Sequence, residues 1–205
     1  LTTARSQLGG CGLQTAGLFF GGITSAPAYT AVAETYDGTS FTEGPDMSTA
    51  RGLMSPAQNG SSTATFGASG GDPTTAATEE YNFATTVITP GAWASGGSLN
   101  TARYGTAGAG TQTAALVAGG YYPPAISNAS EEYNGSSWSE GNNLNTARMY
   151  VGGSGTQTAA LASGGDQLPS PRYSILVEEY DGSSYKILYL LKIKIWVLVE
   201  HKLQL

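Results

Sequence analysis

The chain has 205 residues and a formal net charge of −6, and only 12% of its residues are charged. A surface that binds nucleic acid needs clustered Lys and Arg to displace counterions from phosphates, so this composition argues against nucleic acid as a partner. One cysteine, Cys11, and one histidine, His201, provide neither an intrachain disulfide nor a Cys/His zinc site, and we expect no metal and no cofactor. The 29 glycines and 9 prolines favour short strands and tight turns over helices.

Four copies of one motif, each of about 50 residues, follow one another along the chain. Each copy begins with a short polar stretch that ends in arginine: LTTAR, MSTAR, LNTAR and LNTAR. Each then continues through small residues to a pair of glycines and on to a segment with a tyrosine near its end. We therefore divide the chain into repeats over residues 1–46, 47–98, 99–143 and 144–185, followed by a segment of different composition over 186–205.

The third repeat is the clearest, and it predicts four short strands. After Arg103, the stretch YGTAGAG has the small side chains of an inner strand where backbones crowd together. TQTAALVAGG predicts a second strand that ends at the doublet Gly119-Gly120, because glycine is free to adopt positive φ. SEEY and SSWSE predict the third and fourth strands, joined by a two-residue turn at Asn134-Gly135. Four antiparallel strands per repeat indicate a propeller blade.

The same hairpin turn recurs as Asp37-Gly38 and Asp181-Gly182. An aromatic residue follows each repeat tyrosine after five positions in the first, third and fourth repeats, as Phe41, Trp138 and Tyr185. In the second repeat Trp93 comes twelve residues after its tyrosine, which predicts a hairpin loop seven residues longer.

A glycine doublet, a tyrosine, an aromatic residue a few positions later and an arginine that opens the next unit together resemble the kelch family of β-propellers. The resemblance covers roughly residues 1–185, and it departs from the usual motif in the short spacing from tyrosine to the aromatic residue. The LNTAR and GTQTAAL units also resemble kelch-like repeats in virion and tail-associated proteins of phages. The resemblance implies an all-β, kelch-type propeller of four blades with four antiparallel strands each. Because kelch propellers usually have more blades, we expect this chain to be part of a larger one.

One arginine and one glutamate recur in every repeat. They are Arg5, Arg51, Arg103 and Arg148, and Glu34, Glu79, Glu131 and Glu178. Because buried charges need a partner, we interpret them as structural ion pairs and hydrogen bonds between blades. The alternative is a polar ring around the propeller axis that binds a ligand.

The last twenty residues contain all four lysines of the chain and no glycine. Their apolar stretch, residues 187–199, is interrupted by Lys192 and Lys194 and is too short to span a bilayer, so we expect no membrane partner. When the third base of each codon is read with the first two of the next, residues 196–204 can encode Gly-x-Ser-Gly-Thr-Gln-Thr-Ala-Ala, which matches residues 152–160. Our hypothesis is that the segment is an out-of-frame fifth repeat, and the alternative is a genuine hydrophobic strand or helix.

Catalytic constellations are difficult to assemble from these residues, and we expect the protein not to be an enzyme. The repeats contain no histidine for a Ser/His/Asp set or for the copper site of kelch-type radical oxidases. Paired glutamates such as Glu131-Glu132 are neighbours in a strand, and they point to opposite faces rather than toward a shared substrate. A binding or structural role remains, with a protein or a glycan as ligand. The expected setting is a virion or tail-associated protein, and the alternatives are a kelch-type adaptor and a secreted carbohydrate-binding propeller.

The segments that differ between repeats all follow the glycine doublets, so they should emerge on one face of the propeller. Loops on a rigid scaffold are where binding residues concentrate. Aromatic side chains with polar tips suit both sugar stacking and protein contacts. The expected contacts are Tyr121, Tyr122, Asp166, Gln167, Arg172 and Tyr173, with Tyr29 and Asp72 from the earlier blades. The alternatives are variable loops without a ligand, and a site at the long hairpin loop around Ile88 and Pro90.

Overall fold

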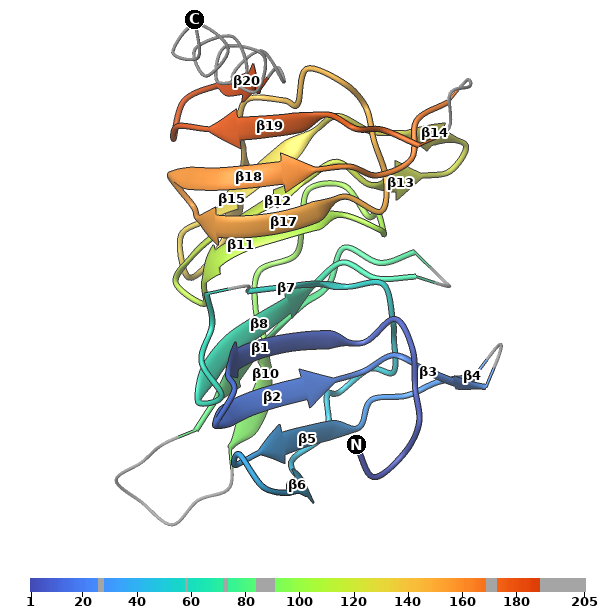
Figure 1. Ribbon diagram of the computed structural model, residues 1–205, viewed down its shortest axis with the longest axis vertical. Coiled ribbons are helices and arrows are strands. Elements are labelled where there is room, and N and C mark those ends of the chain that lie inside the picture. Colours follow the sequence, from blue (N-terminus) through green and yellow to red (C-terminus); the bar gives the residue numbers. More distant parts are fainter. Residues whose placement is uncertain (26–27, 58, 72–73, 84–90, 169–172, 189–205) are drawn as a thin grey trace, which may run out of the picture.

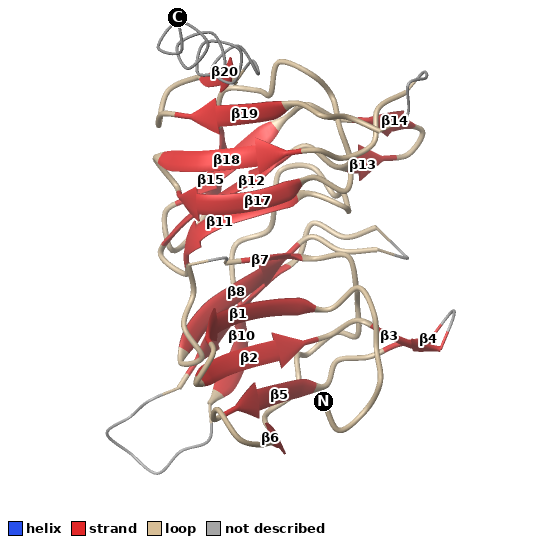
Figure 2. Cartoon of the chain, viewed as in Figure 1, coloured by secondary structure: helices blue, strands red, loops and turns tan. Residues whose placement is uncertain are grey.

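The computed structural model describes residues 1–205 except 26–27, 58, 72–73, 84–90, 169–172 and 189–205. The described residues form twenty β-strands joined by turns and loops, without a helix (Figure 2). Within this described part, no helix has the length and apolar character needed to cross a membrane.

Sixteen of the strands form four antiparallel sheets of four strands, one from each repeat. The first sheet has the order β1 (Gly9–Leu13), β2 (Ala16–Phe20), β5 (Ala33–Tyr36) and β6 (Phe41–Glu43). The second has the order β7 (Ser55–Pro56), β8 (Ala64–Ala68), β9 (Thr78–Asn82) and β10 (Ala92–Ser95). The third has β11 (Ala107–Thr111), β12 (Ala114–Ala118), β15 (Ser130–Tyr133) and β16 (Trp138–Glu140). The fourth has β17 (Gly152–Thr156), β18 (Ala159–Ser163), β19 (Val177–Tyr180) and β20 (Tyr185–Ile187).

The four sheets are the blades of a β-propeller, as the sequence predicted. The first strands of the sheets are innermost, and β1, β7, β11 and β17 pack against one another in that order. Figure 1 shows the first two blades in the lower half of the view and the last two in the upper half. Three of the innermost strands, β1, β11 and β17, are rich in small residues because neighbouring backbones approach closely there. A Cβ on Gly153 would lie 2.5 Å from the carbonyl oxygen of Gly108 in the preceding blade.

Two of the variable segments are short hairpins rather than irregular loops. The segment after Gly22 contains β3 (Ile23–Ser25) paired with β4 (Ala28–Tyr29), and the segment after Gly120 contains β13 (Tyr121–Tyr122) paired with β14 (Ala125–Ile126). Both hairpins project from the same side of the propeller (Figure 1). We call this side the doublet face, because the second strand of every blade ends there.

The doublets adopt the positive φ that the sequence predicted, with one correction in the second repeat. Gly21, Gly119 and Gly164 have φ of 64°, 68° and 63°, and the residue in the same conformation in the second blade is Ser69, at 63°. The structural doublet of that blade is therefore Ser69-Gly70 and not Gly70-Gly71. The buried Ser69 hydroxyl lies 3.1 Å from the Thr106 hydroxyl of the next blade, and this hydrogen bond offsets the cost of a side chain at that position.

Hydrophobic clusters between adjacent blades hold the propeller together. Between the third and fourth blades, Leu116 and Ala118 of one blade pack with Ala160, Ala162 and Tyr185 of the other. The repeat tyrosine of each blade lies against the aromatic residue opposite it, with ring centroids 4.9 Å apart for Tyr133 and Trp138. Trp93 pairs with Tyr81 in the same register, so the longer hairpin of the second repeat moves its aromatic residue along the sequence but not within the blade.

The polar tip of Trp138 reaches the preceding blade. Trp138 Nε1 donates a 3.0 Å hydrogen bond to Thr78 Oγ1, the residue that precedes the repeat glutamate. The corresponding residue of the first blade is Ala33, which has no side-chain acceptor. Among the described residues, the buried Trp93 Nε1 has no hydrogen-bond partner. The interface between the first two blades therefore lacks one hydrogen bond that the next interface has.

The repeated arginines and glutamates form buried ion pairs, and here the prediction needs a correction, because each pair lies within one repeat and not between blades. The pairs are Arg5–Glu34 at 3.2 Å, Arg51–Glu79 at 3.1 Å, Arg103–Glu131 at 3.0 Å and Arg148–Glu178 at 2.8 Å. Their side chains are at most 3% exposed, so they form no polar ring open to a ligand. The arginine backbone joins the blades instead, since the carbonyl oxygens of Arg51 and Arg148 accept hydrogen bonds from Gly22 and Gly120 of the preceding doublets.

The fourth blade continues slightly into the segment of different composition. β20 includes Lys186 and Ile187, and Lys186 Nζ lies 2.6 Å from Asp181 Oδ2 in the hairpin turn. The codons on which the frameshift hypothesis depends belong to residues 196–204, which lie outside the described residues, so it stays a prediction.

Candidate functional site

A ladder of backbone hydrogen bonds runs around the propeller axis on the doublet face. The ladder residue of each blade is the second residue after the repeat arginine, and the four are Gln7, Leu53, Gly105 and Tyr150. The amide of Leu53 donates to the Gln7 carbonyl oxygen at 3.0 Å, Gly105 donates to Leu53 at 3.3 Å, and Tyr150 donates to Gly105 at 2.6 Å. Each blade is thereby linked to the previous one at the axis.

All four ladder residues adopt the left-handed conformation, with φ between 55° and 65°. This conformation is uncommon for residues other than glycine, and for bulky ones such as Leu53 and Tyr150 it is a genuine outlier. Glycine occupies the position in the third blade, where a Cβ on Gly105 would lie 2.9 Å from the ring of Tyr150. The other three blades accept a cost of about 1–2 kcal/mol per residue to keep a side chain there.

These side chains line a basin of about 450 Å³ at the centre of the doublet face. Gln7, Leu53 and Tyr150 come from the ladder, and Tyr104 comes from the position just before it. The variable segments and the ends of the strands complete the lining with Ile23, Tyr29, Gly71, Thr74 and Pro123. The volume is within the range of small-molecule sites, about 300–1,000 Å³.

The structure brings some of the predicted contact residues to this basin. Tyr29 lines it directly, and Tyr121 packs on the lining residue Tyr104 with ring centroids 5.4 Å apart. Tyr122 is 52% exposed on the β13–β14 hairpin beside Pro123, so it lies near the rim.

The predicted residues of the fourth blade form a separate group. Asp166 is buried and bridges Met149 on one side and Tyr173 on the other. The Gln167 amide donates to the Ser174 hydroxyl at 3.0 Å, and Tyr173 is 77% exposed. None of these residues is in the lining of the basin. Asp72 and Arg172 lie outside the described residues, as does the loop around Ile88 and Pro90.

Four lining residues from outside the variable segments, Gln7, Leu53, Tyr104 and Tyr150, were not predicted from the sequence. They lie directly after the repeat arginine, in a stretch that we interpreted as part of an inner strand. A signal was present, because the two positions after the arginine read Ser-Gln, Gly-Leu, Tyr-Gly and Met-Tyr in the four repeats, whereas the arginine itself does not vary. Residues that vary beside constant ones indicate a binding site, but we considered such variation only in the segments after the glycine doublets.

The repeated carboxylates are engaged in structural contacts. Glu131 pairs with Arg103 and accepts the Asn100 amide at 2.7 Å, whereas its neighbour Glu132 faces the other way and accepts the Tyr180 hydroxyl of the next blade. Tyr133 makes the equivalent bond to Glu80, at 2.5 Å. Burial and the Glu80 carboxylate raise the pKa of Tyr133 to about 12, and burial and Glu132 likewise raise the pKa of Tyr180. The expected placement of neighbouring glutamates on opposite faces is confirmed.

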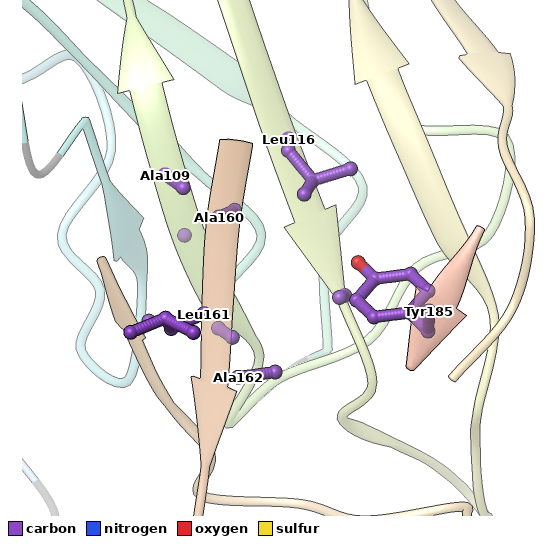
Figure 3. A pocket seen from close by; sticks show the side chains of 10 residues that line it. Ala109, Leu116, Ala160, Leu161, Ala162 and Tyr185 are labelled. Carbon is purple, nitrogen blue, oxygen red and sulfur yellow. The ribbon is translucent and has the colours of Figure 1, made fainter. Parts of the chain in front are cut away.

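Two other cavities are less suited to a ligand. A gap of about 10 Å³ lies between the third and fourth blades, where Leu116, Ala162 and Tyr185 meet (Figure 3), and it has room for about one water molecule. A shallow cleft of about 300 Å³ lies between the first and second blades at the opposite end from the doublets, beside Tyr36, Tyr81 and Phe83. In this cleft Thr35 occupies the position that Glu80 and Glu132 hold in the second and third blades. Threonine is shorter than glutamate, so it leaves the cleft open.

Comparison with known proteins supports the fold and leaves the family open. No protein-family model matches the chain, and no curated protein matches it. Among solved structures, the protein YjhT, a β-propeller, superimposes with a TM-score of 0.67 over 85% of this chain. The sequences are 10% identical, and the match spans 66% of the YjhT chain, slightly less than two thirds of its length. At this identity the likeness establishes the propeller fold alone.

Proposed function

We propose that this chain is a non-enzymatic binding propeller whose ligand, a protein or a glycan, docks on the doublet face. The observation that carries this proposal is the axial basin, where the first, second and fourth blades keep a side chain in the left-handed conformation although glycine fulfils the same backbone role in the third blade. Strained residues persist at binding sites because the surrounding structure holds them in place for a purpose other than stability.

The arrangement of polar groups supports binding rather than catalysis. The repeated glutamates are occupied by arginines of their own blade or by tyrosines of the next. The basin presents tyrosine rings, one amide and one hydroxyl from Gln7 and Thr74, which suits recognition by stacking and hydrogen bonding.

We propose further that the chain belongs to the kelch family and that it is part of a virion or phage tail. The doublet at the end of the second strand and the tyrosine paired with an aromatic residue across the outer hairpin support the kelch relationship. A kelch-type adaptor and a secreted carbohydrate-binding propeller are the alternative settings. Sequencing of the complete gene and its neighbours distinguishes them: tail or baseplate genes favour the virion, and a signal peptide or an adaptor domain in the same gene favours the others.

Two sets of substitutions test the location of the site. In the basin set, Tyr29, Tyr104 and Tyr150 are changed to alanine. In the loop set, Tyr121, Tyr122 and Arg172 are changed to alanine. Both proteins are applied to a glycan array and to pull-downs against the products of neighbouring genes. Binding that only the basin set abolishes supports the proposal as stated, and binding that only the loop set abolishes moves the contacts to the variable segments. Wild-type protein that binds nothing in either assay overturns the proposal.

A further inference from the structure

All nine described residues that line the axial basin are uncharged. The guanidinium groups of Arg103 and Arg148, which precede the lining residues Tyr104 and Tyr150 in the sequence, are at most 1% exposed and already paired with Glu131 and Glu178. An anionic ligand would lose water without gaining a counter-charge from any of these nine described residues, which is costly. The described lining therefore selects against phosphorylated, sulfated and sialylated ligands.

The lining combines apolar faces with polar tips. Tyr29, Tyr104 and Tyr150 contribute aromatic rings that end in hydroxyl groups, while Leu53, Ile23 and Pro123 contribute apolar surface. Gln7 and Thr74 add groups that can both donate and accept hydrogen bonds. A sugar ring has the matching chemistry, because its C–H face packs on an aromatic ring and its hydroxyl groups need donors and acceptors around the edge.

The size of the basin excludes larger occupants. A volume of about 450 Å³ accommodates a ligand of small-molecule size. An α-helix with side chains is about 10–12 Å across and would have to lie over the basin rather than enter it.

Resting on the binding function proposed above, we propose that the axial basin is a site for an uncharged saccharide unit, with Tyr150 as the residue on which the sugar ring stacks. Tyr150 is 46% exposed, its backbone amide donates a hydrogen bond to the carbonyl oxygen of Gly105, and its ring centroid lies 6.4 Å from that of Tyr104. The hydrogen bond holds the backbone in place, and the Tyr104 ring supports one side of the Tyr150 ring. Preorganisation of this kind lowers the entropy lost on binding.

The test uses the whole chain and a printed panel of neutral oligosaccharides, with sialylated and sulfated versions of the same glycans beside them. We expect binding to neutral glycans and weaker binding to the charged versions. Titration calorimetry with the free monosaccharide of the best glycan then shows whether one sugar unit is sufficient or whether a chain is required. The variant Tyr150→Gly is expected to weaken binding about tenfold or more, the equivalent of about 1.4 kcal/mol. Its thermal midpoint should stay the same or rise, because glycine relieves the left-handed conformation.

Leu53→Gly serves as a second variant, because Leu53 has the same left-handed conformation, which glycine adopts without strain. Leu13→Ala serves as the control. Leu13 is 75% exposed in the β1–β2 hairpin at the opposite end of its blade, so its loss should leave glycan binding unchanged. Binding of charged glycans alone, or equal binding by Tyr150→Gly, Leu53→Gly and wild type, overturns the saccharide assignment. If no glycan binds but a protein partner does, and basin variants abolish that binding, the saccharide assignment fails while the binding function stands.

Discussion

The buried indole nitrogen of Trp93 provides a quantitative test of how the blades are joined. Trp138 donates its indole hydrogen bond to Thr78 of the preceding blade at 3.0 Å, and the equivalent residue beneath Trp93 is Ala33. The substitution Ala33→Ser introduces a hydroxyl acceptor of the kind that Thr78 supplies, without the additional methyl group. A net intramolecular hydrogen bond is worth about 0.5–1.5 kcal/mol, so the variant should be more stable by about 1 kcal/mol.

For a chain of this size, a gain of about 1 kcal/mol corresponds to a thermal midpoint about 2–4 °C higher. Differential scanning calorimetry measures the midpoint, and tryptophan fluorescence during urea unfolding gives the free energy. The reciprocal variant Thr78→Ala leaves the Trp138 indole without an acceptor and should cost about 1–3 kcal/mol. If Ala33→Ser lowers the stability while Thr78→Ala leaves it unchanged, the reasoning about this repeated contact is refuted.

Three further predictions concern the repeated contacts. Arg148→Ala leaves Glu178 buried and unpaired and should cost about 3–5 kcal/mol, measured by urea unfolding, whereas the double variant Arg148→Met with Glu178→Gln should lose clearly less. Gly120→Ala should destabilise the chain by more than 1 kcal/mol in the same assay, because φ is 104° there and a Cβ would lie 2.4 Å from Thr106 Cγ2; equal stability would contradict the assigned conformation. The pKa of Tyr133 is raised to about 12 in the folded chain, so its contribution to stability is complete below about pH 10 and is lost as the pH rises from 10 to 12. Tyr133→Phe should make alkaline unfolding less steep in that window, and an unchanged profile would show that Tyr133 does not titrate on unfolding.

The sequence alone was sufficient for the blade. The glycine doublets and the Asn-Gly and Asp-Gly turns determine the conformation of only a few neighbouring residues. Local signals of this kind, repeated along the chain, can be recognised without knowing the fold. The register of Trp93 opposite Tyr81 could also be anticipated, because an inserted loop lengthens a hairpin without changing what its strands pair with. The second doublet was misplaced by one residue, because Ser69 can replace glycine only through its hydrogen bond to Thr106 in the next blade.

Tertiary structure decided how the blades meet and where the basin lies. The sequence showed one arginine and one glutamate in every repeat, but each of the first three arginines has a glutamate in its own repeat and another in the next. Only the packing of the strands shows that the near one is its partner. The residues of the basin come from all four repeats, and they converge because hydrogen bonds between the left-handed residues, two positions after each arginine, link neighbouring blades. This conformation is imposed by the hydrogen bonds between neighbouring blades and not by the residue, since Gln7, Leu53 and Tyr150 have no local preference for it.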